Sequence, residues 1–468
     1  MSEPKPYLIR VFDLIVDAIR GTDEDLTKIS INRAIILLAI LMVIEMMMEG
    51  IFAVVDAFFV SRISEEAVAT VGITENVMSI IYSIAIGVSI AATAMVARRT
   101  GEGDKKAAAN TAAQAILLAV GLALLIGVFG TIFAEDILRL MGAENNVVQQ
   151  GAGYTRIMFG GNVVIILLFL LNGIFRGIGN ANIALRSLIV SNGLNIILDP
   201  CLIFGLGPFP ELGIEGAAIA TNIGRGTGVL FQLYILFNGS AIIRLLAADF
   251  KIQLGIIGRM LKVGAGGAGQ YMISSASWIF LMMIITDFGT QVVAGYVIAI
   301  RVIIFAILPA WGMSNAAATL VGQNLGAGQQ DRAEKSVWIT AMYASGLLLA
   351  ISFVFFFFAP QIVDFFEGGE LAKQTAVDCL KIVSLGYFIF GFGMVMSQSL
   401  NGSGDTKTPT WINFFCFWLL QAPLAYYTAI YLEWGVTFIY WSVFFSYVVY
   451  AIIFAIIFKR GKWKEIQI

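Results

Sequence analysis

Long apolar stretches separated by short polar segments make up almost the whole chain after residue 30. A helix that crosses the hydrocarbon core of a bilayer needs about 20 mainly apolar residues. Twelve stretches have this length, and they lack the alternation of apolar and polar residues that the strands of a membrane barrel would show. The pattern predicts an all-α membrane protein with twelve transmembrane helices, near residues 33–60, 72–97, 107–133, 152–174, 183–205, 216–238, 256–286, 292–321, 333–358, 377–399, 410–431 and 435–458.

The composition agrees with a chain that lies mostly in a membrane. Of 468 residues, 59% are hydrophobic and 13% are charged, about half the charged fraction of a soluble domain. This excludes a soluble enzyme, a disulfide-rich secreted scaffold and a disordered chain. A net charge of -2, without a basic cluster in the spans, argues against nucleic acid as a partner. The sequence has no histidine and three scattered cysteines, so it offers no zinc site and no histidine-based catalytic triad.

The distribution of positive charge predicts the orientation, because Lys and Arg in short loops stay on the cytoplasmic side. Most of the 29 Lys and Arg residues fall in the N-terminus, the C-terminus and the loops after even-numbered spans, whereas the opposite loops hold only Arg62, Arg139 and Lys373. We therefore expect a multi-pass protein of the cytoplasmic (inner) cell membrane with both termini in the cytoplasm. Residues 1–30 include an amphipathic stretch, 7–20, that would lie on the lipid surface or form a packed or frayed extension.

The chain repeats itself at an offset of 225 residues. Several glycines and a serine recur at this one offset in corresponding segments, namely Gly87 and Ser89 with Gly312 and Ser314, Gly101 and Gly103 with Gly326 and Gly328, and Gly177 and Gly179 with Gly402 and Gly404. Because each repeat has an even number of spans, both halves enter the membrane from the same side. We expect an N-terminal six-helix bundle over 31–240, a cytoplasmic linker over 241–255, a C-terminal six-helix bundle over 256–460 and a cytoplasmic tail over 461–468.

Several acidic residues remain inside the expected spans of the first half, where each costs roughly 2.5–3.5 kcal/mol. Glu45, Glu49 and Asp56 follow one another at helical spacing and share a face of the first span, and Asn195 and Asp199 share a face of the fifth. Carboxylate and amide oxygens are what a hard monovalent cation, or a proton with its water, would need. The alternative is that these acids are paired with arginine or placed at helix ends. Three further acids near span ends, Glu75, Asp287 and Asp378, are expected at the interface.

The second half has a different polar character. All eight tryptophans lie there, and no stripe of acids runs through its spans. Aromatic faces with a few polar groups suit flat, amphipathic or cationic molecules, although tryptophans also anchor spans at the headgroups. The residues that we expect to line a substrate cavity are one methionine from the first half and five residues from the second, namely Met46, Gln270, Ser274, Trp278, Arg301 and Gln398. Arg301 would adjust the charge of that cavity or form a salt bridge.

Four stretches of the chain resemble the MATE family of multidrug and toxin extrusion antiporters. They are VVDAFFVSRISEEAVATVG (54–72), VARRTGEGD (96–104), GLNIILDPCLIFGLGPFPELGIEGAAIAT (193–221) and VGQNLGAG (321–328), and the resemblance covers nearly the whole chain after about residue 30. It implies twelve helices in two pseudo-symmetric six-helix bundles around a central cavity. It also implies alternating access, with export of organic, often cationic, compounds in exchange for inward Na⁺ or H⁺ and without a cofactor.

The resemblance also implies a cation site in the first bundle. Asp56 matches the family's acid in span 1, Asn195 and Asp199 match its pair in span 5, and Thr221 matches its hydroxyl in span 6. If the coupling ion is Na⁺, these four residues would be its ligands. Glu49, where the family often has an amide, and Glu45 are possible additional coupling acids.

Two departures from the family pattern are visible. Branches that resemble NorM carry acids in spans 7 and 10, where this chain has Gln270 or its neighbours and Phe390, so the second acidic site is missing and the pattern is closer to the prokaryotic DinF-like branch. Leu41 stands near the place of a proline that is common early in span 1, which argues against a proline-based bend of that helix.

Other functions fit the sequence less well. A lipid or lipid-linked oligosaccharide flippase of the same superfamily would favour a cationic cavity, and the acidic stripe of the first span argues against it. A membrane-embedded enzyme would need a nucleophile–base or metal constellation, which the sequence does not offer. A channel would need a symmetric ring of ligands, and the two halves differ. We therefore expect a monomeric secondary antiporter for small organic compounds.

Overall fold

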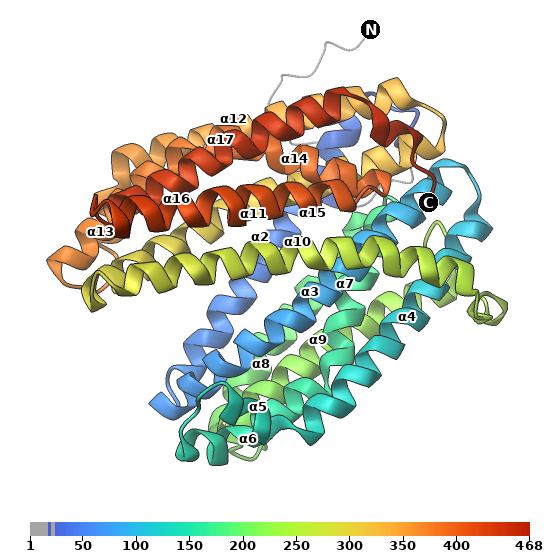
Figure 1. Cartoon of the computed structure of the whole chain (residues 1–468). Helices are drawn as coiled ribbons and strands as arrows, with labels where there is room; N and C mark the ends of the chain where they lie inside the picture. Colours follow the sequence, from blue (N-terminus) through green and yellow to red (C-terminus); the bar gives the residue numbers. More distant parts are fainter. Residues whose placement is uncertain (1–16, 20–23) are drawn as a thin grey trace, which may run out of the picture. The chain divides into compact units, whose positions relative to one another are not determined.

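The computed structural model describes residues 17–19 and 24–468, and within this part of the chain all regular structure is helical (Figure 1). The expected amphipathic stretch 7–20 lies almost entirely outside the described residues. The principal helices are α2 (Ile31–Val60), α3 (Glu65–Gly101), α4 (Lys105–Ile132), α5 (Ala134–Leu140), α6 (Asn145–Gly160), α7 (Asn162–Gly177), α8 (Ala181–Phe204), α9 (Gly213–Asn238), α10 (Leu254–Thr286), α11 (Thr290–Gly326), α12 (Gln330–Val363), α13 (Glu370–Leu385), α14 (Tyr387–Ser403), α15 (Lys407–Asn413), α16 (Ala422–Tyr426) and α17 (Thr437–Lys459).

The helices account for all twelve expected spans. Ten helical segments of the described chain are long and apolar enough to cross a membrane, and the bent pair α13–α14, with 58° between its helices, makes an eleventh. The remaining expected span is α9, whose 26 residues are interrupted by Glu215 and Arg225. The span after α14 is unusual, because π-helical turns (Phe414–Gln421 and Tyr427–Tyr431) flank the short helix α16 with its Pro423. The expectation of an all-helical membrane protein is confirmed.

The repeat in the sequence is also a repeat in the helices. α3 and α11 both have 37 residues and begin 225 positions apart, and α4 and α12 begin at the same offset. The loop glycines agree as well, because Gly103 and Gly328 have φ of 77° and 72°, in the left-handed region that favours glycine. Gly103 and Gly328 therefore form the same kind of turn at equivalent positions of the two halves.

Local sequence explains where the helices begin. Ser64 accepts a hydrogen bond from the backbone N–H of Ala67 at 3.0 Å, and Asp104 accepts one from Ala107 at 2.8 Å, so each side chain caps a helix. The cap at Ser64 starts α3 seven residues before the expected position 72, because Glu65 and Glu66 form a polar first turn that the apolar pattern does not include. The capping residues place the interhelical loops outside the apolar core.

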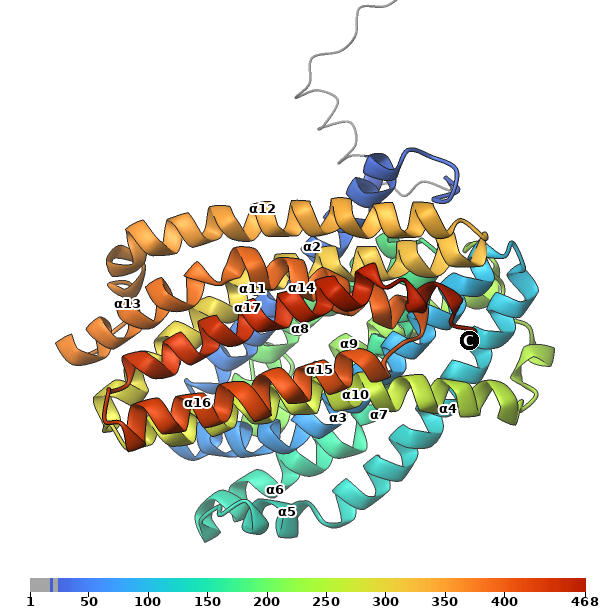
Figure 2. The same cartoon turned by 45° about the horizontal axis from the view of Figure 1, so that its top comes forward.

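Contacts divide the chain into two compact units. The first consists mainly of Ile44–Ala268 and the second of Asp25–Val43 with Gly269–Ile468, so α2 and α10 each contribute to both. In the first unit α8 packs along α9, and α7 packs against α3 and α4 (Figure 1). In the second unit α11, α12 and α14 pack together and α17 lies along α14 (Figure 2). The expected division into bundles over 31–240 and 256–460, joined by a cytoplasmic linker over 241–255, stays a prediction.

Candidate functional site

Close packing of α8 on α9 forms the base of the candidate site. Ser191 donates a hydrogen bond to the carbonyl oxygen of Gly224 at 2.7 Å, and one turn further Ser187 bonds the carbonyl of Gly228 at 3.0 Å. A Cβ on Gly224 would lie 2.9 Å from the carbonyl oxygen of Ser191 and 3.1 Å from the Cβ of Asn195. Only glycine therefore allows α9 to approach α8 this closely, and this approach brings polar residues of the two helices to one level.

Asn195 and Asp199 lie one turn apart on α8, and both are completely buried. The amide nitrogen of Asn195 donates a hydrogen bond to Oδ1 of Asp199 at 3.1 Å. The other oxygen of each side chain, Asn195 Oδ1 and Asp199 Oδ2, is buried and has no hydrogen-bond partner. Two neighbouring acceptor oxygens without a donor are an arrangement that a cation can satisfy.

Asp56 of α2 and Thr221 of α9 complete the group. The hydroxyl of Thr221 donates a long hydrogen bond to Asp56, at 3.5 Å, and Asp56 is half-buried. Asp56 also lies close enough to Asp199 for their charges to interact. The structure thus brings together the four residues that the resemblance suggested, from three different helices.

The four residues fit a small, hard cation better than a transition metal. Oxygen ligands from carboxylate, amide and hydroxyl groups suit hard ions, whereas zinc and its neighbours prefer nitrogen and sulfur. Within residues 17–19 and 24–468, no three His, Cys, Asp or Glu side chains lie close enough together to hold a metal ion. The site therefore has two carboxylates, one amide and one hydroxyl to offer to Na⁺, or two carboxylates to offer to a proton.

A buried arginine, Arg225, borders this site and was not expected from the sequence. It lies on α9 one turn after Thr221, pairs with Glu49 at 3.7 Å, and has its guanidinium carbon 4.5 Å from the centre of the Phe52 ring. It also interacts electrostatically with Asp56 and Glu75, while its Nε and Nη1 have no hydrogen-bond partner. The sequence contained a signal for this position of Arg225, because residues four apart, such as Thr221 and Arg225, lie on one face of a helix.

Glu75, which was expected at the membrane interface, is half-buried on α3, and its depth in the membrane stays a prediction. This side chain of α3 interacts electrostatically with Asp56 and Arg225, so it belongs to the same charged cluster. Glu49, Asp56 and Glu75 thus all interact with Arg225, and Asp199 interacts with Asp56.

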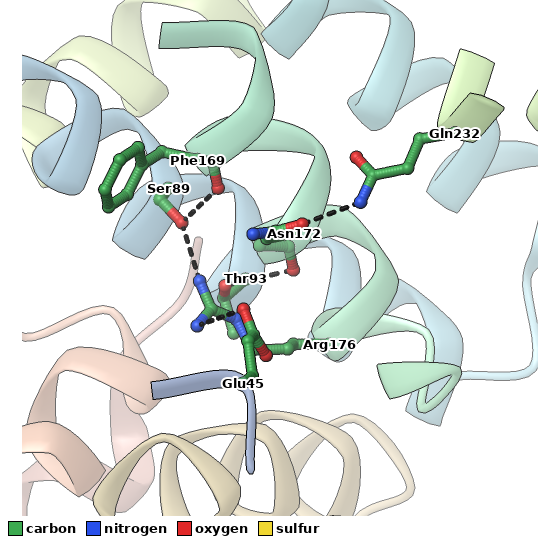
Figure 3. A network of polar contacts seen from close by, with 8 residues as sticks. Glu45, Ser89, Thr93, Phe169, Asn172, Arg176 and Gln232 are labelled. Carbon is green, nitrogen blue, oxygen red and sulfur yellow. Dashed lines mark hydrogen bonds and ion pairs between the residues drawn. The ribbon is translucent and has the colours of Figure 1, made fainter. Parts of the chain in front are cut away.

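Glu45 lies in a separate polar network of the same unit, shown in Figure 3. Arg176 of α7 pairs with Glu45 at 3.4 Å and donates a hydrogen bond to the hydroxyl of Ser89 at 3.1 Å. Ser89 in turn donates to the carbonyl oxygen of Phe169 at 2.7 Å. Glu45 is completely buried and is paired with an arginine, which is the alternative that we considered for the buried acids. Its role as a coupling acid stays a prediction.

The residues expected to line a substrate cavity are only partly brought together. Gln270 is buried and exchanges hydrogen bonds with Asn401, which also donates to Gln398 at 2.9 Å. Ser274 and Trp278 lie further along α10 and are half-buried, and Arg301 of α11 is exposed. Met46 is half-buried on α2 in the first unit. Their contribution to a substrate cavity stays a prediction.

Comparison with known families decides the class of the protein. The MatE family model matches residues 38–201 and 268–427, that is, most of both repeats. The chain belongs to the MatE family. Membership makes it a multidrug and toxin extrusion transporter of the membrane and not an enzyme.

Relatives and solved MATE structures extend this result over nearly the whole chain. A probable multidrug resistance protein NorM of Thermotoga maritima is 24% identical over 93% of this chain and 94% of its own length. An FAD transporter of Shewanella oneidensis is 26% identical over 80% of this chain and 83% of its own. The crystal structure of a MATE transporter in the bent conformation is 27% identical, with a TM-score of 0.87 over 96% of this chain and 98% of that chain. A multidrug resistance MATE transporter in an outward-facing conformation gives 0.88 at 26% identity, over 94% and 98%.

Proposed function

We propose that this MATE transporter exports organic cations in exchange for Na⁺ or H⁺, and that the ion binds Asp56, Asn195, Asp199 and Thr221. The observation that carries the proposal is the pair of buried, unpartnered oxygens on Asn195 and Asp199, where Asp199 also interacts electrostatically with Asp56. We place the protein in the cytoplasmic membrane with both termini in the cytoplasm, from its distribution of Lys and Arg.

Binding of the ion would link three helices. Asp56 is on α2, Asn195 and Asp199 are on α8, and Thr221 is on α9. Without a cation, the carboxylates of Asp56 and Asp199 repel each other and α2 is free to move away from α8. A bound cation attracts both, so it binds the conformation in which the helices are close more tightly than the other. This difference in affinity is what couples ion entry to a change of conformation.

The charge of the cluster favours a cationic cargo. Glu49, Asp56, Glu75 and Asp199 outnumber Arg225, and opposite charges attract strongly where water is scarce. A flippase for a pyrophosphate-linked lipid would need the reverse excess, so this rival is disfavoured. The Shewanella relative is named an FAD transporter, which means that family membership alone does not determine the cargo.

Transport in proteoliposomes tests the proposal. The purified full chain is reconstituted, and accumulation of a fluorescent organic cation such as ethidium is followed after an inwardly or outwardly directed Na⁺ or H⁺ gradient is imposed. We expect one of the two gradients to drive transport in the wild type and the Asp287→Asn variant, whose carboxyl is exposed and outside the site. Asp56→Asn should abolish this coupling. Transport that neither gradient drives, or that Asp56→Asn leaves intact, would refute the proposed mechanism.

A further inference from the structure

The loop between α9 and α10, residues 239–253, is folded onto the first unit. Figure 1 shows it at the right-hand end of α10. Its short 3₁₀ helix, Ala247–Phe250, packs against α4, and Phe250 stacks on Phe237 of α9 with 5.9 Å between the ring centres. Ile243 and Leu245 are each 2% exposed, so part of the loop belongs to the apolar core of this unit.

One buried glutamine of α4 fastens the loop. Gln114 is completely buried, and its amide nitrogen donates hydrogen bonds to the carbonyl oxygens of Asp249 at 2.9 Å and Lys251 at 2.8 Å. Its amide oxygen accepts a hydrogen bond from the backbone N–H of Gln253 at 2.8 Å. Within the loop, Asp249 also accepts a hydrogen bond from the backbone N–H of Leu246 at 2.8 Å. The loop therefore has a defined shape, and so has the surface that it presents.

Three large apolar side chains are exposed on this surface. Leu246 and Ile252 of the loop are 54% and 70% exposed, and Leu254, the first residue of α10, is 78% exposed. The irregular backbone around them carries polar groups that the hydrocarbon core of a bilayer would leave unsatisfied. Apolar side chains on such a loop instead fit the boundary between the headgroups and the acyl chains.

The first turns of α10 continue the same surface. The helix has 33 residues and is about 50 Å long, whereas the hydrocarbon core is about 30 Å thick, so the end turns of α10 lie among the headgroups. Leu254 and the exposed Leu261 are seven residues apart and share one face of the helix. Two exposed cations lie beside this face, Lys262 about 80° and Arg259 about 140° around the helix from Leu254.

Four exposed cations accompany the apolar side chains. They come from the loop and the first turns of α10, namely Arg244, Lys251, Arg259 and Lys262. Within residues 17–19 and 24–468, none of the four pairs with a carboxylate. The acid in the sequence between positions 239 and 268 is Asp249, which is buried and bonded to the backbone of the loop. We call the four cations, together with Leu246, Ile252 and Leu254, the linker surface, and its charge is entirely positive.

We propose that the linker surface binds anionic phospholipids. Its apolar side chains enter the outer part of the acyl layer, and its cations bind the phosphates of the headgroups. Phosphatidylglycerol carries a net negative charge and phosphatidylcholine carries none, so charge complementarity selects the anionic lipid. Each cation close to an anionic surface raises the affinity about fivefold. The proposal uses the proposed cytoplasmic side of this loop, and it depends neither on the ion site nor on the cargo.

Deuterium uptake of the purified full chain in lipid nanodiscs tests the proposal. Nanodiscs of phosphatidylcholine alone are compared with nanodiscs of equal parts phosphatidylcholine and phosphatidylglycerol, and exchange is followed over residues 244–254. The linker variant has all four cations of the linker surface replaced by glutamine. The matched control removes the same number of exposed cations elsewhere on the expected cytoplasmic side, with Lys105→Gln, Lys106→Gln, Arg460→Gln and Lys462→Gln. Each protein is compared with itself in the two lipids, and the affinity for short-chain phosphatidylglycerol is measured in detergent.

We expect phosphatidylglycerol to lower deuterium uptake over residues 244–254 at least about twofold in the wild type and in the control. The linker variant should show equal uptake in the two lipids. Its affinity for short-chain phosphatidylglycerol should fall at least about tenfold, and that of the control less than about threefold. Wild-type uptake that does not depend on the headgroup would overturn the proposal, and so would an equal loss of affinity in the two variants.

Two further measurements separate a lipid surface from other kinds of site. Ile252→Asn leaves the charge unchanged and should weaken binding of short-chain phosphatidylglycerol at least about threefold, because an apolar side chain no longer enters the lipid. Wild-type affinity in this variant would contradict insertion. Inorganic phosphate added to phosphatidylcholine nanodiscs should leave uptake over residues 244–254 unchanged. Protection by phosphate alone would show a site for a free anion and would overturn the lipid surface. These measurements need no transport, so their outcome is independent of the gradient experiments.

Discussion

The side-chain amide of Asn195 donates a hydrogen bond to the Asp199 carboxylate one helical turn away, at 3.1 Å, and the remaining oxygen of each side chain is buried without a partner. An unsatisfied buried polar group costs about 1–3 kcal/mol. Lone pairs on both oxygens could therefore coordinate a cation, whereas a proton would bind Oδ2 of Asp199. Asp56 and Thr221 add a second carboxylate and a hydroxyl from neighbouring helices.

Replacement of Asp199 tests the carboxylate of this pair. We predict that Asp199→Asn lowers ion-driven transport at least about tenfold, because a charge-assisted ligand contributes about 1.5–3 kcal/mol. The measurement is the initial rate of ethidium transport in proteoliposomes at equal amounts of reconstituted protein. Asp287→Asn, which removes an exposed carboxylate after α10, is the matched control and should transport as the wild type does. Equal loss in both variants would argue against a special role of Asp199.

Thr221 tests the contribution of the hydroxyl. Thr221→Val keeps the shape of the side chain but removes the donor to Asp56, and we predict that the concentration of coupling ion needed for half-maximal transport rises about threefold to tenfold. Thr221→Ser keeps the hydroxyl and should stay close to the wild type. An unchanged ion dependence in Thr221→Val would show that the 3.5 Å contact plays no part in ion binding.

Arg225 tests the charge balance of the cluster. Arg225→Gln removes the cation that faces Glu49 and interacts with Asp56 and Glu75. The cluster then attracts cations more strongly, so we predict a lower KM for an organic cation together with a lower maximal rate, because release becomes slower. Glu49→Gln removes a negative charge and should shift the KM in the opposite direction. Shifts of the same sign in both variants would contradict this electrostatic account.

Gly224 tests the packing that forms the site. Gly224→Ala would place a Cβ 2.9 Å from the carbonyl oxygen of Ser191, and we predict a loss of about 1–3 kcal/mol in stability, together with reduced transport. Gly226→Ala is the control, since its Cβ would meet only Val164, at an ordinary 3.6 Å. Thermal unfolding in detergent measures both variants. Equal melting temperatures for the two would show that α8 and α9 need not approach so closely.

The sequence predicted the helices well because an apolar span of about 20 residues is a strong, one-dimensional signal. It also suggested Asp56, Asn195, Asp199 and Thr221, although Asn195 and Asp199 came from helical spacing and Thr221 only from family resemblance. Arg225 was visible as a charge within a span, but its partner Glu49 lies on another helix. Which residues of two helices meet depends on their rotation and depth, and a single sequence does not contain that information.

The passage of α2 and α10 between units was likewise beyond the sequence. The offset of 225 showed that Gly87 and Gly312 correspond, but not that each touches the first helix of the other repeat. Glu45 and Gln270 are 225 residues apart, as are Arg176 and Asn401, but only the structure shows that Glu45 contacts Arg176 and that Gln270 contacts Asn401. The sequence shows which residues occupy equivalent positions in the two repeats, whereas the contacts that they make depend on how the helices pack.

The most direct test of the central claim is ion movement driven by substrate. Proteoliposomes are loaded with ethidium and diluted into ethidium-free buffer without an ion gradient, and entry of radioactive Na⁺ or acidification of the interior is recorded as ethidium leaves. The account predicts that the wild type and Asp287→Asn take up one of the two ions as ethidium leaves, and that Asp199→Asn takes up neither. Ion entry in Asp199→Asn equal to that of the wild type, or ethidium efflux from the wild type without entry of either ion, would contradict it.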